Sequence, residues 1–204
     1  MIVINLFAGP GSGKSTTCAG VFAKLKLAGI NCEMALEYAK DKVWENSHEV
    51  LDDQIYVFGK QLHRIFRLKD KVEVVITDSP LLLSILYDKS ENPFLRDLVL
   101  DQFNKFENRN YFIHRNTIYN PKGRLQTEDE AKEIDKVLIN LLGKFDVDYK
   151  TVDKDNAADI IFKEIISELL KIAEHLLTLF ATNFSLKSIV FEKNKLSLLS
   201  ILKR

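Results

Sequence analysis

The chain has 204 residues, which is enough for one α/β domain with a substantial core. Hydrophobic residues make up 46% and charged residues 28%, ordinary values for a globular protein. The 29 basic residues balance the 29 acidic ones, so the zero net charge gives no support for broad electrostatic attraction to nucleic acid. The two cysteines, Cys18 and Cys32, are expected to be buried thiols in a reducing compartment rather than a disulfide.

The N-terminus shows no signal peptide, since Met1 runs directly into an apolar strand. No apolar run in the sequence reaches the length of a membrane span. We therefore expect a cytoplasmic protein without a membrane partner.

The first strand, residues 2–7, is apolar on both faces and leads into AGPGSGKST, residues 8–16. A strand, a glycine-rich turn and a helix are the context of a P-loop (Walker A motif), whose backbone N–H groups bind phosphate oxygens. The strict pattern has glycine at position 8, and Ala8 fits if the turn needs no positive φ there. The predicted nucleotide-binding residues of this loop are Gly9, Pro10, Gly11, Ser12, Gly13, Lys14, Ser15 and Thr16.

Helical spacing predicts the first helix over residues 14–28, closed by Gly29. A weaker strand over residues 30–36 then delivers Glu37 to its carboxyl end. Ligands of open α/β sheets bind beyond the carboxyl ends of the strands, so Glu37 is a candidate catalytic residue. The alternative is a solvated glutamate at the start of a helix.

Residues 47–68 are predicted to form one long amphipathic helix. Gln61 or Arg64 on this helix could reach an acceptor base, although a solvated surface role is favoured for both. Its expected buried stripe consists of Leu51, Ile55, Phe58, Leu62 and Ile65.

The next strand, residues 72–77, is an apolar run that ends at Asp78, which is the Walker B pattern. In P-loop proteins this aspartate holds Mg²⁺ directly or through water, and the P-loop serine or threonine supplies a second oxygen. Ser15 and Asp78 are therefore the predicted metal ligands. Ser79 is expected to cap the following helix with Pro80 at its first position, and a further helix is expected near residues 94–108.

A fourth strand, residues 110–114, leads into a loop over residues 115–126 that carries Arg115 and Arg124. Phosphoryl transfer needs positive groups that close over the γ-phosphate, and an arginine-bearing lid meets that need. The alternative is a solvated basic loop. Thr127 and Glu130 form a capping box that starts a helix closed by Gly143.

The fifth strand, residues 147–152, is followed by Asn156 at the position where this architecture contacts the nucleotide base. A long helix should run from Asn156 to about residue 181. The predicted fold is α/β with three layers, a five-stranded parallel sheet in the order 2-3-1-4-5 between helices, and a short lid. Residues 1–182 would form the P-loop kinase domain, and residues 183–204 an extension that is a candidate dimer contact or edge strand.

Three classes of P-loop protein share this loop. A GTPase needs an N-K-x-D guanine reader, and the nearest match, residues 104–107, has glutamate in place of aspartate in a helical context. Hydrolytic ATPases usually carry glutamate directly after the Walker B aspartate, where this chain has Ser79. Small kinases take their base from another strand and add arginines in a lid, which fits Glu37, Arg115 and Arg124.

The segments AGPGSGKST, LEYAK (residues 36–40), VVITDSP (residues 74–80) and NPKGRLQTEDEA (residues 120–131) resemble a phage-type group of small P-loop kinases, often labelled AAA-family ATPases or nucleotide kinases. The group is similar to nicotinamide riboside kinases, thymidylate-kinase-like enzymes and phage kinases of 5-hydroxymethyluracil in DNA. The resemblance covers residues 1 to about 170 and implies a phage-encoded enzyme that acts in the host cytoplasm.

These observations predict an ATP- and Mg²⁺-dependent kinase of a small nucleoside-, nucleotide- or nicotinamide-riboside-like acceptor. Lys14, Glu37, Asp78, Arg115 and Arg124 are the expected catalytic residues, with Glu37 or Asp78 as the base. One alternative makes the acceptor a hydroxymethylated pyrimidine in DNA, which the zero net charge disfavours. Another is a regulatory, nucleotide-dependent switch whose assembly changes through the extension.

Overall fold

The computed structural model describes residues 1–90, 92–115 and 127–183. It divides the chain into two compact units, Met1–Ala158 and Asp159–Arg204. The predicted boundary between residues 182 and 183 stays a prediction. Most of the expected lid, including Arg124, and the expected extension beyond residue 183 lie outside the described residues.

The first unit is built on a five-stranded sheet in the order β2-β3-β1-β4-β5, with every neighbouring pair parallel. This confirms the predicted fold class and strand order. Every residue of β1 is buried, as its unbroken apolar sequence requires of a central parallel strand. The strands are β1 (Ile2–Phe7), β2 (Cys32–Met34), β3 (Val74–Thr77), β4 (Glu107–His114) and β5 (Lys150–Asp153).

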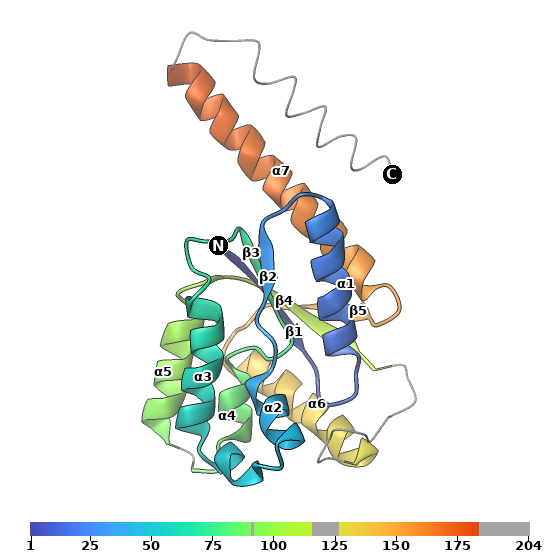
Figure 1. The fold of residues 1–204 in the computed structure, drawn as a ribbon, viewed down its shortest axis with the longest axis vertical. Coiled ribbons are helices and arrows are strands. Elements are labelled where there is room, and N and C mark those ends of the chain that lie inside the picture. The colour runs from blue at the N-terminus through green and yellow to red at the C-terminus, as the bar shows by residue number, and fades with distance from the viewer. Residues whose placement is uncertain (91, 116–126, 184–204) are drawn as a thin grey trace. The chain divides into compact units, whose positions relative to one another are not determined.

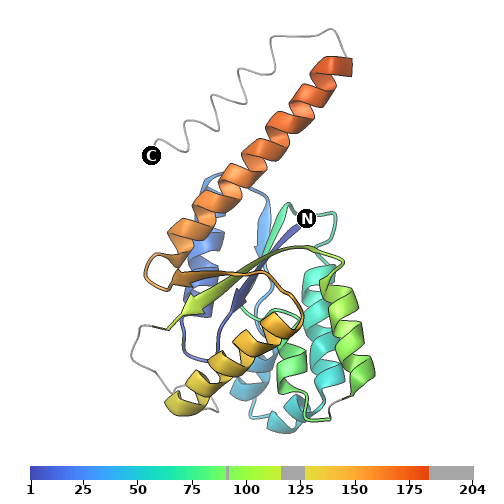
Figure 2. The ribbon, with the colours of Figure 1, turned by 180° about the vertical axis from the view of Figure 1, so that it is seen from behind.

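Helices cover both faces of the sheet (Figures 1 and 2). Helix α1 lies on one face, and α3, α4, α5 and α6 lie on the other. Helix α7 (Ala157–Asn183) forms nearly all of the described part of the second unit. The other elements are α1 (Lys14–Leu27), α2 (Tyr38–Trp44), the 3₁₀ helix η1 (His48–Asp52), α3 (Gln54–Phe66), α4 (Leu83–Tyr87), α5 (Pro93–Phe103) and α6 (Glu128–Lys144).

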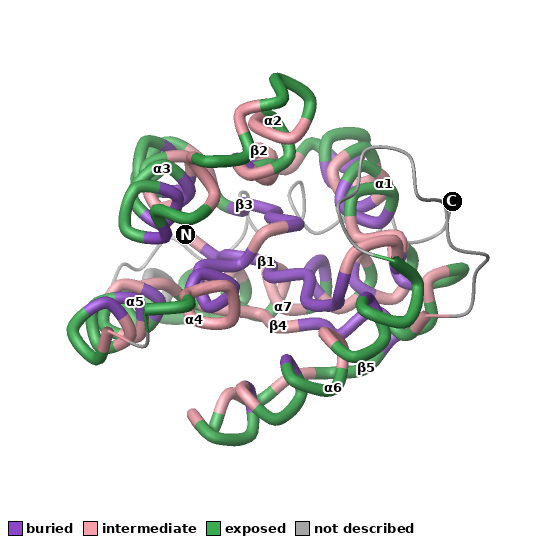
Figure 3. Tube along the Cα trace, turned by 90° about the horizontal axis from the view of Figure 1, so that it is seen from below, coloured by how far each residue is buried: buried purple, intermediate pink, exposed green. Residues whose placement is uncertain are grey.

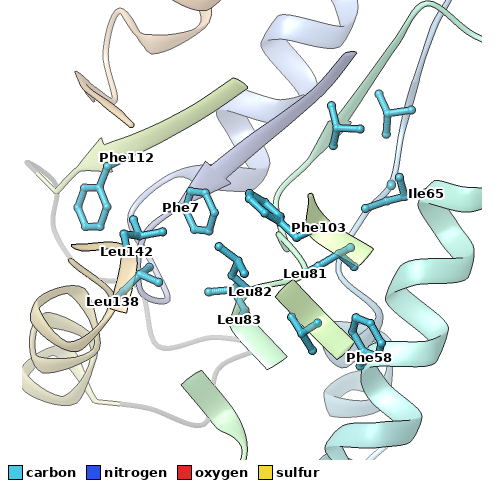
Figure 4. Close-up of a cluster of buried hydrophobic side chains, with 14 of the residues drawn as sticks. Phe7, Phe58, Ile65, Leu81, Leu82, Leu83, Phe103, Phe112, Leu138 and Leu142 are labelled. Carbon is cyan, nitrogen blue, oxygen red and sulfur yellow. The ribbon is translucent and has the colours of Figure 1, made fainter. Parts of the chain in front are cut away.

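The main hydrophobic core fills the space between the sheet and the helices of the second face (Figure 4). Phe7 and Phe112 from the strands meet Leu138 and Leu142 from α6, and Leu82 lies between this group and the other helices. Figure 3 shows the same pattern along the chain, with β1 and β3 buried and the outer turns of α3 and α5 exposed. Both cysteines are buried free thiols, as predicted.

A buried polar side chain of β1 is held by the neighbouring strand β4. Asn5 of β1 is 1% exposed, and its amide donates to the side-chain oxygens of Asn108 at 2.8 Å and Asn110 at 2.9 Å. Both acceptors lie on β4, where Asn5 pairs in register with Asn110. The buried amide is therefore satisfied by two residues of the neighbouring strand.

The prediction of one continuous helix over residues 47–68 is wrong. Asp53 interrupts it, because its carboxylate accepts from the backbone N–H of Tyr56 at 3.0 Å and caps a new helix. A capping residue takes non-helical backbone angles, so η1 ends before α3 begins. The predicted buried stripe is also partly wrong, since Ile55 is 61% exposed while Val57 is buried.

Two predicted helix boundaries also need correction. Gly143 lies within α6, and the residue with left-handed backbone angles after that helix is Asp146, at φ 50°. Ser79 is not a cap, because α4 begins only at Leu83 and its N-cap position is Leu82. The capping box of Thr127 and Glu130 and the left-handed Gly29, at φ 80°, are confirmed.

Candidate active site

The glycine-rich loop between β1 and α1 has the backbone geometry of an anion-binding turn. Gly11 and Gly13 adopt positive φ values of 80° and 99°, which side chains rarely tolerate. Ala8 is not among the described residues with positive φ, so alanine is accommodated there as predicted. The Ser12 hydroxyl is fully buried and has no hydrogen-bond partner within the described residues, which leaves a polar atom of the loop available to a ligand.

The Lys14 ammonium group lies inside this loop. It donates to the carbonyl oxygens of Ala8 at 2.7 Å and Gly9 at 3.0 Å. Burial lowers the pKa of Lys14, while the nearby carboxylates of Glu37 and Asp78 act in the opposite direction. The loop thus holds a desolvated amine at the N-terminus of α1, where phosphate oxygens are favoured.

Asp78 accepts hydrogen bonds both from the loop region and from the segment that follows β2. Its Oδ2 accepts from the Ser15 hydroxyl at 2.5 Å, and its Oδ1 accepts from the backbone N–H of Glu37 at 3.0 Å. The Asp78 residue is 2% exposed, so both oxygens are held in fixed positions. Sequence reasoning placed Ser15, Glu37 and Asp78 in one site, and the structure brings all three together.

The environment of Glu37 favours its protonated form. Burial raises the pKa of Glu37, and the Asp78 charge adds to this, while the Lys14 ammonium opposes it. Tyr87 lies in the same surroundings, and burial together with the charges of Glu37 and Asp135 raises the pKa of its phenol. A carboxylate with a raised pKa is a stronger base than an ordinary glutamate, and such shifts are typical of groups that transfer protons.

The oxygen atoms of Ser15 and Asp78 fit a magnesium ion. A hydroxyl and a carboxylate that already meet at 2.5 Å are hard oxygen donors of the kind Mg²⁺ takes, with water and phosphate supplying the other positions. No group of three or more histidine, cysteine, aspartate or glutamate side chains with metal-binding geometry occurs among the residues described. The donor set therefore matches a site that shares its ion with a nucleotide.

A cavity of about 710 Å³ extends from the loop across the carboxyl ends of β2 and β3. At one end it is lined by the loop, including Gly13, Lys14 and Ser15, and Glu37 lies beside them. The other end is formed by side chains of α2, η1, α3 and α4, and these include Val43, Trp44, His48, Leu51, Gln54, Val57, Leu83 and Tyr87. The cavity therefore connects the phosphate-binding loop to a compartment of mixed polarity, in which Trp44 and Tyr87 lie together with charged side chains that include Lys40, Glu49, Asp52 and Lys89.

Arg115 follows β4 and lies against the loop rather than free in solvent. Its Nη1 donates to the Pro10 carbonyl at 2.8 Å, and its Nε donates to Asp135 Oδ2 at 3.0 Å. Its side chain is 9% exposed. Of the two arginines expected from the sequence, Arg115 is thus beside the phosphate-binding loop, and Arg124 lies outside the described residues.

Two residues beside the loop were missed by sequence reasoning. Asp135 of α6 accepts from the backbone N–H of Gly9 at 2.5 Å. The stem of Lys154, in the turn after β5, packs so close to Gly13 that an added Cβ would lie 2.7 Å from its Cγ. No sequence motif signals either contact, although Lys154 lies in the segment where the base contact was expected.

Asn156 lies two residues after Lys154 in the same turn. Its backbone N–H donates to the Asp153 carbonyl at 3.1 Å. The turn between β5 and α7 therefore borders the loop through Lys154, and the expected contact of Asn156 with a nucleotide base stays a prediction.

Gln61 and Arg64 do not have the solvated role that was favoured for them. Gln61 is 3% exposed, accepts from the Tyr38 N–H at 3.0 Å and donates to the Ala35 carbonyl at 3.3 Å. Arg64 donates to the Leu36 carbonyl at 2.9 Å and pairs with Asp41. Both side chains therefore fix the backbone on either side of Glu37.

Comparison with known proteins places this site in a family. No curated protein matches the chain. Among solved structures, a deoxyadenosine kinase from M. mycoides, with the products dCMP and a flexible dCDP bound, is 17% identical with a TM-score of 0.49 and covers 81% of this chain and 99% of that chain. None of the described helices is long and apolar enough to cross a membrane. The model of a family described as an AAA domain matches residues 3–159, which include the loop, Glu37, Asp78, Arg115 and Asp135, and the chain belongs to that family.

Proposed function

We propose that the protein is a kinase that transfers the γ-phosphate of ATP to a hydroxyl group of a small nucleoside-like acceptor. Glu37 carries this proposal. It is a half-buried carboxyl group in the same cavity as Lys14 and Ser15, between the phosphate-binding loop and a compartment walled by side chains of α2, η1, α3 and α4. A hydrolytic ATPase has no need of such a compartment, whereas a kinase must hold an acceptor next to the γ-phosphate.

The phosphate end of the cavity would bind the triphosphate through backbone N–H groups of residues 11–15 and the Lys14 ammonium. To reach a phosphate, this ammonium must exchange its contacts with the Ala8 and Gly9 carbonyls for contacts with phosphate oxygens. Ser15 and Asp78 would hold Mg²⁺, which when bound neutralises charge on the β- and γ-phosphates. Arg115, whose guanidinium donates to the Pro10 carbonyl, would add positive charge beside the phosphate-binding loop.

Glu37 is proposed to act on the acceptor. Its carboxylate accepts the proton of the attacking hydroxyl while the new oxygen–phosphorus bond forms and the bond to ADP breaks. Asp78 accepts from the Glu37 N–H and Gln61 accepts from the Tyr38 N–H, so the backbone that carries the carboxylate is held in place. A raised pKa makes the Glu37 carboxylate a stronger proton acceptor than an exposed glutamate.

The far compartment supports a planar ring on the acceptor. Trp44 lines it and is 65% exposed, which leaves an indole face available for stacking. Val57 and Leu83 add apolar wall, while Gln54 and His48 offer polar atoms for orientation. Walls of this kind suit a nucleobase or a nicotinamide-like ring.

The test is transfer of labelled γ-phosphate from ATP with Mg²⁺ to a panel of nucleosides, nucleoside monophosphates, nicotinamide riboside and hydroxymethylated DNA. Label is expected on a nucleoside-like hydroxyl. In Glu37→Gln, kcat should fall by roughly 10²–10⁴ while ATP binding is retained, because the proton acceptor is lost and the loop is not. Label that appears only as free phosphate, or a Glu37→Gln variant with unchanged kcat, would contradict the proposal.

A further inference from the structure

The Asp135 carboxylate lies at the junction of the phosphate-binding loop, α6 and the end of β4. Its Oδ1 accepts from the backbone N–H of Gly9 at 2.5 Å, and its Oδ2 accepts from Arg115 Nε at 3.0 Å. The side chain is only 16% exposed. Each oxygen therefore serves a different partner, and both partners border the predicted phosphate site.

Arg115 closes this arrangement into a ring of contacts. Besides its pairing with Asp135, the guanidinium donates from Nη1 to the Pro10 carbonyl at 2.8 Å. Its Nη2 lies 3.5 Å from the Ala131 carbonyl of α6. The loop thus contacts Asp135 through Gly9 and Arg115 through Pro10, at two adjacent residues. Removal of the carboxylate would leave a charged guanidinium that is 9% exposed without its anion.

The approach of α6 to the loop leaves no spare room. A Cβ added at Gly9 would lie 2.5 Å from the Ala131 carbonyl oxygen and 3.0 Å from Asp135 Oδ1. Only glycine lets the loop come this close to the helix. The first turns of α6 therefore hold one edge of the loop by direct contact as well as by hydrogen bonds.

The negative charge of Asp135 is unexpected beside a predicted phosphate site. A carboxylate beside a triphosphate site repels the ligand, so electrostatics alone would favour its absence. Here both of its oxygens accept hydrogen bonds from the groups that shape the site. The Asp135 charge also opposes the lowering of the pKa of Lys14 by burial, which favours the charged ammonium.

We propose that Asp135 is a positioning residue of the nucleotide site, which sets the Gly9 edge of the phosphate-binding loop and the guanidinium of Arg115 in the geometry that receives the phosphates. This inference rests on the proposed function for the identity of the ligand, ATP. It assigns Asp135 no contact with the acceptor or with the reacting atoms.

The test uses Asp135→Asn, for which electrostatics alone and a positioning role predict opposite changes in the Kd of Mg·ATP. Asp135→Asn removes a negative charge, which by electrostatics alone would tighten the binding of Mg·ATP. An amide, however, offers a single acceptor oxygen and puts its NH₂ against a donor, so either Gly9 or Arg115 loses its partner. We therefore expect the Kd of Mg·ATP, measured by calorimetric titration, to rise about tenfold or more. An unchanged or lower Kd would overturn the proposal.

The matched control is Asp129→Asn, which removes the same charge from an exposed position on the same helix. Its Kd should stay within about twofold of the unsubstituted protein, since exposed charges interact weakly with a site through water. An equal loss of affinity in both variants would show an effect of helix charge and would overturn the positioning role.

A second measurement is independent of nucleotide binding. The Gly9 amide proton is hydrogen-bonded to a carboxylate, so it should resonate downfield of ordinary amide protons in the NMR spectrum and should move upfield in Asp135→Asn but not in Asp129→Asn. If ATP does not bind the unsubstituted protein, the proposed function fails. This signal still tests whether Asp135 holds the loop, and an ordinary Gly9 shift there would overturn that contact.

A third pair of variants covers the case in which Asp135→Asn does not fold because Arg115 is left unpaired. Neither Arg115→Gln nor the double variant Arg115→Gln/Asp135→Asn holds a guanidinium that has lost its anion, and in Arg115→Gln the Asp135 carboxylate keeps the Gly9 N–H as a donor. The double variant is expected to lose the downfield Gly9 signal that Arg115→Gln keeps, and to bind Mg·ATP more weakly. Equal Kd values and equal Gly9 shifts in the two proteins would reject the positioning role.

Discussion

At the scale of single residues, the ionised carboxylate of Glu37 lowers the free energy of unfolding. Burial raises its pKa above the ordinary value of 4.5, so the folded protein binds its proton more tightly than the unfolded chain does. Between 4.5 and the raised pKa, the folded state holds more protons, and the free energy of unfolding therefore falls as the pH rises. Above that window the full cost of the buried charge is present.

Glu37→Gln should consequently raise the melting temperature at pH 7.5, because the amide carries no charge to desolvate. The gain should vanish below pH 4.5, where the carboxyl group is protonated in both states. Scanning calorimetry at several pH values measures the melting temperatures of both proteins. Glu49→Gln serves as the control, since Glu49 lines the same cavity but is exposed, and no gain is expected there. A gain that is absent at pH 7.5, or that does not depend on pH, would contradict the prediction.

The same scale explains which site residues the sequence could and could not predict. Lys14, Ser15 and Asp78 lie in local motifs from which their roles are predicted, and the structure brings them together as neighbours. Asp135 and Gln61 act through contacts with backbone groups 126 and 23 residues away along the chain, at Gly9 and Tyr38. Any aspartate or glutamine on a helix looks the same in sequence, so only the tertiary arrangement identifies them.

At the scale of elements, hydrophobic periodicity predicted the strands and most helices but not the breaks between them. The segment over residues 47–68 keeps enough apolar spacing to suggest one helix, whereas the Asp53 cap divides it. Capping depends on backbone angles at one residue, and the periodicity around Asp53 does not report them. The capping box at Thr127 was recognisable because its two residues stand at fixed spacing.

The effect of a glycine-to-alanine substitution on stability depends on the backbone angles at that glycine. Gly59 lies inside α3 without a positive φ, and a Cβ added there meets nothing within 4 Å. Gly59→Ala should therefore raise the free energy of unfolding by about 0.5–1 kcal/mol, because alanine loses less conformational entropy in a helix.

Gly29→Ala is the matched control for Gly59→Ala. The space around Gly29 is equally open, but its φ of 80° suits glycine alone, so the alanine variant should lose about 1–2 kcal/mol. Urea denaturation of both variants measures the two free energies of unfolding. Changes of the same sign in the two proteins would mean that the backbone angles do not govern these positions.

At the scale of the whole molecule, the sequence predicted the strand order because a P-loop, a Walker B strand and alternating helices leave few parallel topologies. It did not predict the course of α2 and η1 around the cavity. Their short lengths and mixed composition carry no strong periodicity. The acceptor therefore has to be inferred from the cavity walls that the structure brings together rather than from a motif.

The predicted domain boundary is tested by deleting residues 183–204. If residues 1–182 form the nucleotide-binding domain, the shortened protein should fold and bind Mg·ATP with a Kd within about twofold of the full chain, since a terminal extension outside a domain contributes little to its site. If the extension forms a dimer contact, light scattering should give a lower mass after the deletion. Loss of nucleotide binding would move the boundary, and equal masses would exclude the dimer contact.

The buried Asn5 also has a consequence for the way the chain reaches this fold. It bonds to residues 103 and 105 positions further along the sequence, so β1 and β4 pair only after a long loop has closed, which makes such parallel pairing slow. Apolar side chains alone tolerate a slip of two residues, because the same face stays buried. A slip that brought Asn5 opposite Phe112 would leave Asn5 one acceptor in place of two, because only Asn110 would then stand where Asn108 does now. Asn5 thus discriminates between strand registers during folding and disfavours intermediates that are compact but wrongly aligned.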